Sequence, residues 1–408
     1  MRDPDGSASS GSLGDGSHVP YRFPHPGRDP SRCVPRYRRT VRGALAASWP
    51  ALRIFVWSRL GIWALAAGTV LLVEDELNPS RGRWDTPRLH ELGAAVDVWA
   101  RWDSNWYLRI AESGYSWPSS TPAFFPGYPL LVAGLGRAVG DRFVLAGLVV
   151  SLVACAAAFA LLYRLVADRL GTRDASRSVL YLALFPTSFF LGAVYGESLF
   201  LLLAVATFVL AERGRLGWAA VLSGLALLTR AQGIALLPAL AVFAWRSDRR
   251  ARNLALLLAP VAMFLVFPLV LEVWIGHGLA FVDAQTLWER SLAPLGPLGG
   301  LVQAIGEGDV VGPVLAVGMV ALAVLSWQVL GAPYALYALA ALAIPMALPS
   351  ERLGGLYSFP RFALVAFPCL VALAVLGRDR RVHAAAVAVL AAGLAVGVVR
   401  WALWYWVA

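Results

Sequence analysis

The stretch FVLAGLVVSLVACAAAFALLYRLV, residues 143–166, contains a single charged side chain, Arg164. A membrane-spanning helix needs about 20 mostly apolar residues to cross a hydrocarbon core roughly 30 Å thick, so this stretch predicts a helix that crosses a bilayer. Arg169, Arg173 and Arg177 follow directly after it. Arginines that gather behind a span are typical of connections on the cytoplasmic side of a membrane.

The rest of the chain has the same character. Of its 408 residues, 59% are hydrophobic and only 15% are charged, and the mean hydropathy is +0.65. An ordinary soluble domain is roughly 45–50% apolar and about 25% charged. A soluble fold of this length could not bury so much apolar surface. The sequence therefore predicts an all-α polytopic membrane protein.

Eleven apolar runs can be assigned as spans, and the arginines test that number. The candidate spans are 48–73, 143–166, 178–194, 196–212, 217–228, 233–245, 253–275, 311–330, 333–348, 362–376 and 383–403. With the N-terminus inside, basic residues fall in the connections at 164–177, 213–215, 246–252 and 378–381, and only the inside turn 331–332 lacks one. Eleven helices with a cytoplasmic N-terminus therefore fit the positive-inside rule.

A further apolar run at 126–139 would reverse this pattern if it crossed the membrane, so we expect a helix that lies on or dips into the outer face. The segment 74–142 then forms a large first external loop with interfacial helices, and 276–310 forms a second. Residues 1–47 are rich in Gly, Ser, Pro and Arg without apolar periodicity, which is typical of a disordered cytoplasmic tail. Residues 48–408 form one transmembrane domain in this interpretation.

Composition also excludes several classes of protein. All 35 basic residues are arginine, so the chain lacks the lysine that a P-loop ATPase or a Schiff-base enzyme needs. The net charge of +10 comes from arginines scattered between apolar runs, which favours a membrane protein over a nucleic-acid-binding one. Cys33, Cys155 and Cys369 lie far apart and form no framework of disulfides. No metal-ligand motif is present, and we expect neither a required metal nor a cofactor.

The densest chemical signal is RWDSNWY at 101–107, continued by ESGY at 112–115 and FFPGYP at 124–129. Aromatic rings stack on sugars, and a single carboxylate among them, Asp103, suits a general base that takes a proton from an acceptor hydroxyl. The alternative is an interfacial anchor helix with Asp103 as its cap. The other side chains of this segment that we expect to contact substrate are Arg101, Trp102, Trp106, Tyr107, Glu112 and Tyr128.

These motifs resemble the bacterial members of the PIG-V-like family, relatives of the second GPI mannosyltransferase. The stretches LFPTSFFLGAVYGESLFLLLA (184–204), LALLTRAQGIALLPAL (225–240) and SFPRFALVAFPCLVALA (358–374) extend the resemblance over about residues 48–408. It implies the GT-C membrane fold, which has a large first external loop and another after the seventh span. It also implies transfer of a sugar, typically mannose, from a polyprenyl-phosphate carrier on the extracytoplasmic face. Asp103 takes the place of the family's first-loop catalytic aspartate.

Three further positions are expected on the outer side. Glu197 lies in a very short turn, where an acid is either a favourable start to a helix or part of the site. Arg230, with Gln232, interrupts an apolar segment, and a broken helix at membrane depth usually lines a polar cavity. An arginine there suits a lipid-linked phosphate, although snorkelling to the interface is the alternative. Arg361, at the outer entrance of a helix, is interpreted in the same way.

The sequence thus predicts a multi-pass glycosyltransferase of the plasma membrane. Its expected partners are a polyprenyl-phosphate-linked mannose donor, membrane lipids, and a glycolipid, lipid-linked glycan or protein acceptor, with no nucleic acid. The alternative is a transporter or flippase of a lipid-linked sugar. Such a protein would expose its site to both faces in turn and carry matching polar groups near the bilayer midplane.

Overall fold

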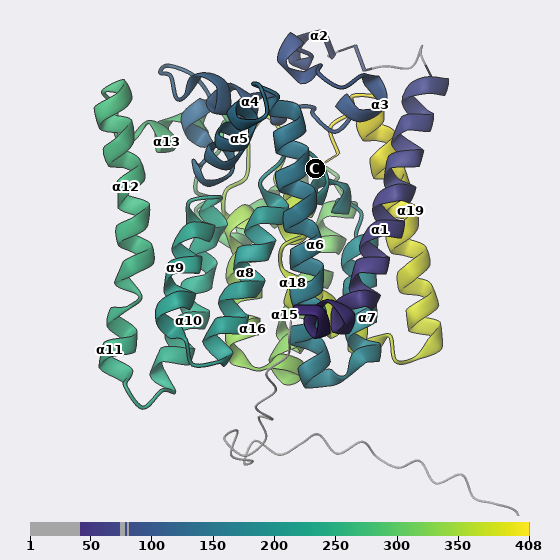
Figure 1. Cartoon of the computed structure of the whole chain (residues 1–408), viewed down its shortest axis with the longest axis vertical. Helices are drawn as coiled ribbons and strands as arrows, with labels where there is room; N and C mark the ends of the chain where they lie inside the picture. The colour runs from purple at the N-terminus through teal and green to yellow at the C-terminus, as the bar shows by residue number, and fades with distance from the viewer. Residues whose placement is uncertain (1–40, 74–77, 80, 408) are drawn as a thin grey trace, which may run out of the picture.

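The computed structural model describes residues 41–73, 78–79 and 81–407. Within these ranges the regular elements are helices, and the only strand-like pairings are isolated bridges between Arg290 and Ser350 and between Ser350 and Gly354. Long helices stand side by side as a bundle, with short helices gathered at one end (Figure 1). The predicted all-α fold is confirmed.

The helices of the bundle are α1 (Val41–Leu72), α6 (Phe143–Leu170), α7 (Thr172–Leu184), α8 (Glu197–Glu212), α9 (Leu216–Leu227), α10 (Leu236–Trp245), α11 (Arg250–Ala255), α12 (Leu258–Ile275), α15 (Val311–Leu330), α16 (Ala332–Ala347), α18 (Phe367–Leu376) and α19 (Arg380–Ala402). The shorter elements are α2 (Arg81–Trp84), α3 (Ala94–Asp97), α4 (Ser104–Ser113), α5 (Gly127–Ala138), α13 (Ala280–Asp283), α14 (Pro297–Gly306) and α17 (Phe359–Ala363), with the 3₁₀ helices η2 (Pro87–Leu89), η3 (Thr121–Ala123), η4 (Ser188–Leu191), η5 (Ala231–Ala235) and η6 (Ala284–Trp288).

Five helical stretches of the described chain are long and apolar enough to cross a membrane: Ser48–Leu72, Phe143–Leu170, Arg250–Ile275, Val311–Leu330 and Arg380–Ala402. Four shorter apolar helices accompany them, at Leu216–Leu227, Ala231–Trp245, Ala332–Ala347 and Phe367–Leu376. All nine overlap predicted spans. The total of eleven spans stays a prediction.

The predicted span 178–194 differs most from the structure. Helix α7 ends at Leu184, and the chain continues through Pro186 and the short η4 before α8 begins at Glu197. Proline has no amide hydrogen and its ring disfavours helical geometry in the residue before it, so the helix stops there. The run is apolar because it is buried inside the protein, where Phe189, Phe190 and Leu191 have no exposed surface.

The two ends of the bundle differ in charge. The start of α1, helix α11 and the starts of α7 and α19 lie at the end opposite α4 and α13 (Figure 1). The arginine-rich connections 164–177, 246–252 and 378–381 belong to that end. This one-sided distribution agrees with the predicted topology, although the side that is cytoplasmic stays a prediction. Helix α1 begins at Val41, inside the predicted tail 1–47, and residues 1–40 of that tail lie outside the described residues.

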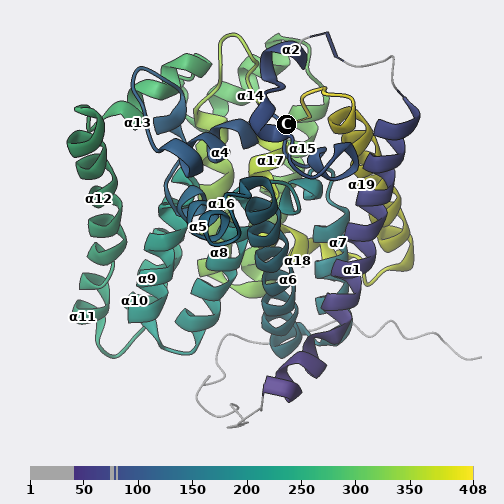
Figure 2. The same cartoon turned by 45° about the horizontal axis from the view of Figure 1, so that its top comes forward.

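The described residues of the predicted first external loop fold into a cap. Its residues form α2 to α5, which lie at one end of the bundle with α13, α14 and α17 (Figure 2). Helix α5 covers the predicted outer-face helix 126–139. Helix α14, in the second loop, packs on α16, yet the opposite face of α14 exposes apolar side chains such as Leu298, Val302 and Ile305.

Two glycines let the segments around the cap approach each other closely. Gly127 donates its backbone N–H to Leu228 O at 2.7 Å, and a Cβ on Gly127 would lie 2.9 Å from that oxygen. A Cβ on Gly233 would lie 2.3 Å from the Cα of Leu227, so only glycine lets η5 fold back against the end of α9. Both contacts fix the chain around Arg230.

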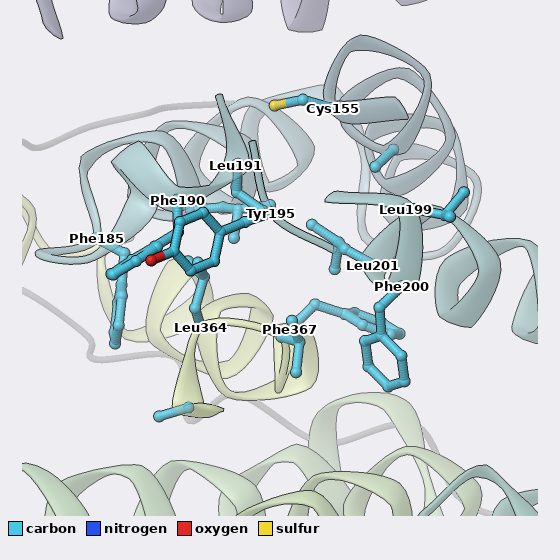
Figure 3. Close-up of a cluster of buried hydrophobic side chains, with 14 of the residues drawn as sticks. Cys155, Phe185, Phe190, Leu191, Tyr195, Leu199, Phe200, Leu201, Leu364 and Phe367 are labelled. Atoms are coloured by element: carbon cyan, nitrogen blue, oxygen red, sulfur yellow. The ribbon is translucent and has the colours of Figure 1, made fainter. Parts of the chain in front are cut away.

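The core runs through the centre of the bundle and reaches up to the cap. The ring of Tyr195 meets Phe190 edge to face, with centroids 4.9 Å apart, and Leu364 and Phe367 lie near them in the same cluster (Figure 3). Such aromatic pairs add about 0.5–1.5 kcal/mol beyond their buried area. The cluster therefore packs the chain before α8 against the chain after α17.

Candidate functional site

A cavity of about 460 Å³ lies beneath the cap. Four of its lining residues are charged, namely Asp103, Arg230, Arg290 and Arg361. They come from the first external loop, the break between α9 and α10, the second external loop and helix α17. The aromatic and polar lining comprises Tyr107, Phe124, Phe125, Gln232, Phe264, Phe281, Gln285, Tyr357, Ser358, Phe362 and Trp406, and the remainder is Ala123, Leu227, Thr229, Ala231, Ile234, Val282, Ile344, Pro345 and Leu348.

Asp103 stands at the N-cap position of α4, but its carboxylate makes no capping hydrogen bond. Instead, Arg361 NH1 donates to Asp103 Oδ2 at 2.6 Å. The backbone N–H of Asp103 donates to the hydroxyl of Tyr195 at 3.0 Å, and that hydroxyl donates to Arg101 O. The side chain of Asp103 is therefore directed to the cavity rather than used as a cap.

Glu197 is the first residue of α8 and is completely buried. One of its oxygens, Oε1, accepts contacts from both Arg361 Nε and Arg230 NH1. The other oxygen, Oε2, has no hydrogen-bond partner among the described residues. Glu197 does not line the cavity. It lies behind two of the cavity's arginines and balances their charge.

Arg230 and Arg361, both predicted to bind a lipid-linked phosphate, line the cavity, and their role there stays a prediction. Arg230 precedes η5 with an extended backbone, and its guanidinium carbon lies 4.9 Å from the ring centroid of Phe362. Gln232 lines the cavity as well, while its Nε2 donates to the carbonyl oxygens of Ala341 and Phe362. Both arginines are nearly buried, so neither snorkels into solvent.

Arg290 was missed by the sequence interpretation. Its guanidinium carbon lies 5.5 Å from the ring centroid of Phe362 and 5.9 Å from that of Tyr357. It forms no ion pair with any described residue. Burial lowers the pKa of Arg290, Tyr357 opposes that shift, and Arg361 adds to it. One signal could have found it: Arg290 is the only arginine of the predicted second external loop, 276–310.

The charges around the cavity do not cancel. Three guanidinium groups, from Arg230, Arg290 and Arg361, face two carboxylates, from Asp103 and Glu197, which leaves one excess positive charge. The three guanidinium carbons all lie within 6.0 Å of the ring centroid of Phe362. An excess of positive charge in a mostly apolar cavity favours an anionic ligand with one negative charge.

The other predicted side chains of the first loop have different positions. Tyr107 lines the cavity, whereas Trp106 lies behind its wall and stacks on Phe124 with ring centroids 6.3 Å apart. Trp102 packs against Trp84, Trp404 and Trp406, outside the cavity lining. These aromatic side chains therefore build the wall and its support.

Three polar side chains that were expected to contact substrate lie away from the cavity. Arg101 NH1 donates to Trp401 O at 2.9 Å and to Ala402 O at 2.6 Å. Burial lowers the pKa of Arg101 to about 9, which leaves it charged near neutral pH. Tyr128 is buried and its hydroxyl donates to Gly147 O. Glu112 pairs with Arg88 at 3.6 Å, and burial raises the pKa of its carboxyl although Arg88 opposes that shift. All three have structural partners.

A metal site is not formed by the part of the chain that the structure describes: no three His, Cys, Asp or Glu side chains are placed to share an ion. The expectation that the protein needs no metal or cofactor stays a prediction.

Comparison with solved structures identifies the fold. The crystal structure of ArnT from Cupriavidus metallidurans bound to undecaprenyl phosphate aligns with a TM-score of 0.52 and 14% sequence identity, over 84% of this chain and 62% of that chain. At this identity the likeness concerns the fold alone. The protein has the GT-C membrane fold.

Comparison of sequences relates part of the chain to a known family. Residues 92–264 match the family model described as mannosyltransferase (PIG-V). GPI alpha-1,6-mannosyltransferase 2 of Rattus norvegicus is 34% identical over 149 residues, 33% of this chain and 29% of the relative. Its counterpart in Mus musculus is 34% identical over 169 residues, 36% of this chain and 33% of the relative. The matches span a third or less of these relatives. Over residues 92–264 the chain is similar to this family, in agreement with the resemblance of its motifs.

Proposed function

We propose that this protein is a membrane glycosyltransferase that moves a mannosyl residue from a polyprenyl-phosphate-linked donor to an acceptor hydroxyl on the extracytoplasmic face. The observation that carries the proposal is the placement of one carboxylate, Asp103, and three arginines around one cavity. The PIG-V family match supports mannose as the sugar. The fold shared with an undecaprenyl-phosphate-bound structure supports a lipid-linked donor.

The chemistry follows from these groups. The acceptor hydroxyl gives its proton to Asp103 while its oxygen attacks the anomeric carbon of the donor. The bond between that carbon and the phosphate oxygen breaks, and the lipid phosphate leaves with the bonding electrons. Attack opposite the leaving group inverts the configuration at the anomeric carbon. The chain supplies a base and an arrangement of positive charge already in place, both of which lower the barrier without rearrangement.

Arg361 lies next to both the proposed base and the arginines that would stabilise the leaving phosphate. It contacts Asp103 on one side and Glu197 on the other, and it lines the same cavity as Arg230 and Arg290. A phosphate that leaves the anomeric carbon gains negative charge, and guanidinium groups stabilise it through paired hydrogen bonds. Glu197 fixes the orientation of Arg361 from behind and is a positioning residue.

The decisive experiment compares wild type with Asp103→Asn in lipid vesicles that contain radiolabelled polyprenyl-phosphoryl mannose and a host lipid extract. A positioned general base contributes about 10²- to 10⁴-fold, and we expect a loss of transfer rate in that range. Glu197 still holds Arg361 in the variant, so its elution on size exclusion should match wild type. Asp141→Asn is the matched control, because Asp141 is an exposed loop carboxylate outside the cavity.

Two outcomes would overturn the proposal. Full activity of Asp103→Asn would remove Asp103 as the base. Label that crosses the bilayer without entering a new product would indicate a flippase of the lipid-linked sugar instead of a transferase.

A further inference from the structure

Tyr195 lies directly behind the candidate base and the arginine that pairs with it. It belongs to the short segment between η4 and α8, and its side chain is completely buried (Figure 3). It does not line the cavity, so it touches no ligand that fills the cavity. A residue in this place acts on the chemistry only through the residues that it holds.

The hydroxyl of Tyr195 bridges the two peptide groups on either side of Trp102. It donates to Arg101 O at 3.1 Å and accepts from the backbone N–H of Asp103 at 3.0 Å. Trp102, between these two peptide groups, has a φ of 54°, in the left-handed region that residues other than glycine adopt only at a cost in free energy. One hydroxyl, used both as donor and as acceptor, therefore holds closed a turn that the chain does not favour by itself.

This turn decides where the carboxylate of Asp103 lies. Aspartate at the N-cap position of a helix favours accepting a hydrogen bond from the first-turn N–H groups, which requires an extended backbone at the cap. Asp103 stands at the N-cap of α4 but has φ −61° and ψ −16°, as inside a helix, and makes no such bond. Its carboxylate accepts from Arg361 NH1 at 2.6 Å instead. If the turn at Trp102 relaxes, the capping position competes with the position in the cavity.

The ring of Tyr195 holds the other member of this ion pair. The guanidinium carbon of Arg361 lies 4.6 Å from the ring centroid of Tyr195, a cation–π contact. The ring is itself fixed by edge-to-face contacts with Tyr107 and Trp401, each at 5.8 Å between centroids. Removal of the hydroxyl leaves these ring contacts in place. The effect of the hydroxyl on Asp103 can therefore be measured separately from the packing of the ring.

We propose that the hydroxyl of Tyr195 is a positioning group that holds the left-handed turn at Trp102 closed and so keeps the carboxylate of Asp103 in the cavity beside Arg361. The inference rests on the proposed function for the role of Asp103 as the base. A general base must lie within hydrogen-bond reach of the proton that it takes, so its orientation sets the rate. Tyr195 contributes to turnover without contact with donor or acceptor.

The test is Tyr195→Phe, which removes one oxygen atom and keeps the ring. We expect kcat to fall by about 10²-fold, the usual effect of misplacing a reacting group by about 1 Å. The KM for the donor should stay near that of wild type, because the cavity lining is unchanged. Tyr337→Phe is the matched control: Tyr337 is completely buried outside the cavity lining, and its hydroxyl donates to Val365 O at 2.9 Å. It should keep the kcat of wild type, with an unfolding midpoint similar to that of Tyr195→Phe.

A double variant separates positioning from a general structural effect. In the Asp103→Asn background, Tyr195→Phe should lower the residual rate no further, because the base that the hydroxyl positions is already absent. A hydroxyl that served only stability would reduce the rate by the same factor in both backgrounds. Losses that multiply, or an unchanged kcat in the single variant, would overturn the inference.

Hydrogen exchange gives a readout that does not depend on turnover. The backbone N–H of Asp103 loses its acceptor in Tyr195→Phe, so the amides of residues 101–108 should exchange severalfold faster than in wild type and in Tyr337→Phe. Unchanged exchange in this segment would contradict the hold on the turn. If wild type transfers no sugar yet the variant shows this change, the proposed reaction fails while the hold of Tyr195 on the turn stands.

Discussion

Trp102, Glu289 and Ser358 have left-handed backbones, with φ of 54°, 50° and 65°. Each precedes a charged residue of the cavity by one to three positions. Conformations of this kind cost on the order of 1–3 kcal/mol each in residues other than glycine, and they persist only where the surrounding packing enforces them. The large aromatic contacts of Trp102 provide such packing. These conformations therefore lower the stability of the fold while they direct charged side chains into one cavity.

The residue whose removal should matter most for stability is Glu197. In Glu197→Gln, Arg230 and Arg361 lose their shared counter-charge, and breaking a buried ion pair in this way costs about 3–5 kcal/mol. We expect a clear fall in the midpoint of thermal unfolding in detergent, together with weaker binding of polyprenyl phosphate. The control is Glu289→Gln, whose ion pair with Arg352 is about half exposed, and exposed pairs contribute about 0–1 kcal/mol. Equal midpoints for the two variants would contradict the positioning role of Glu197.

Sequence alone identified part of the cavity. Asp103 stood out as a lone carboxylate among aromatic residues, Arg230 and Arg361 as arginines at or within apolar segments, and all three line the cavity. Arg101 has the same appearance in sequence, but its partners are backbone carbonyls near the end of the chain, some 300 positions away. A contact at that separation has no local pattern. Arg290 was missed for the same reason, since only the fold brings its loop to α17.

At the scale of elements, the segment after α19 closes the cap. Trp401 Nε1 donates to Val98 O at 2.7 Å, and Trp406 stacks on Tyr357 while lining the cavity. Arg101 ties down the end of α19, from which this segment continues, through contacts with the carbonyl oxygens of Trp401 and Ala402. One wall of the cavity thus depends on a segment that the first external loop holds in place.

Arg101→Ala should therefore loosen this segment. Hydrogen bonds from charged groups contribute about 1.5–3 kcal/mol each, and the variant loses two of them. We expect faster hydrogen exchange in residues 398–407 and a lower unfolding midpoint, with reduced transfer as a consequence. Arg109→Ala, in the same loop with only a 3.5 Å contact to Ser116, is the control. Unchanged exchange in residues 398–407 would show that Arg101 does not hold the segment.

Hydrophobic runs predicted where the long helices lie but not how the shorter ones are interrupted. The run at 178–194 was predicted to be one span, although Pro186 divides it. The run at 126–139 was placed at the outer face by the arginine pattern alone; α5 lies in the cap, and the face on which the cap lies stays a prediction. Apolar composition does not distinguish burial in protein from contact with lipid, which is why such boundaries need tertiary structure.

At the scale of the whole molecule, the helices differ in how much of their surface is buried by the rest of the protein. Helix α12 stands at the margin of the bundle (Figure 1) and packs mainly on α9, with Pro260, Phe267 and Leu271 as its only buried side chains. Most of its remaining surface faces outward. The position of α12 is therefore determined by lipid at least as much as by protein, unlike α6 or α8, which lie in the interior.

A helix of this kind adapts its tilt to the thickness of the bilayer around it. Because Phe264 of α12 lines the cavity, a change in the tilt of α12 changes the shape of that cavity. We expect the transfer rate from polyprenyl-phosphoryl mannose to pass through a maximum as the acyl chains of the vesicle lipids are lengthened at constant protein density. A rate that is independent of acyl-chain length would count against the idea. The supply of donor to this protein would then depend on the membrane that surrounds it.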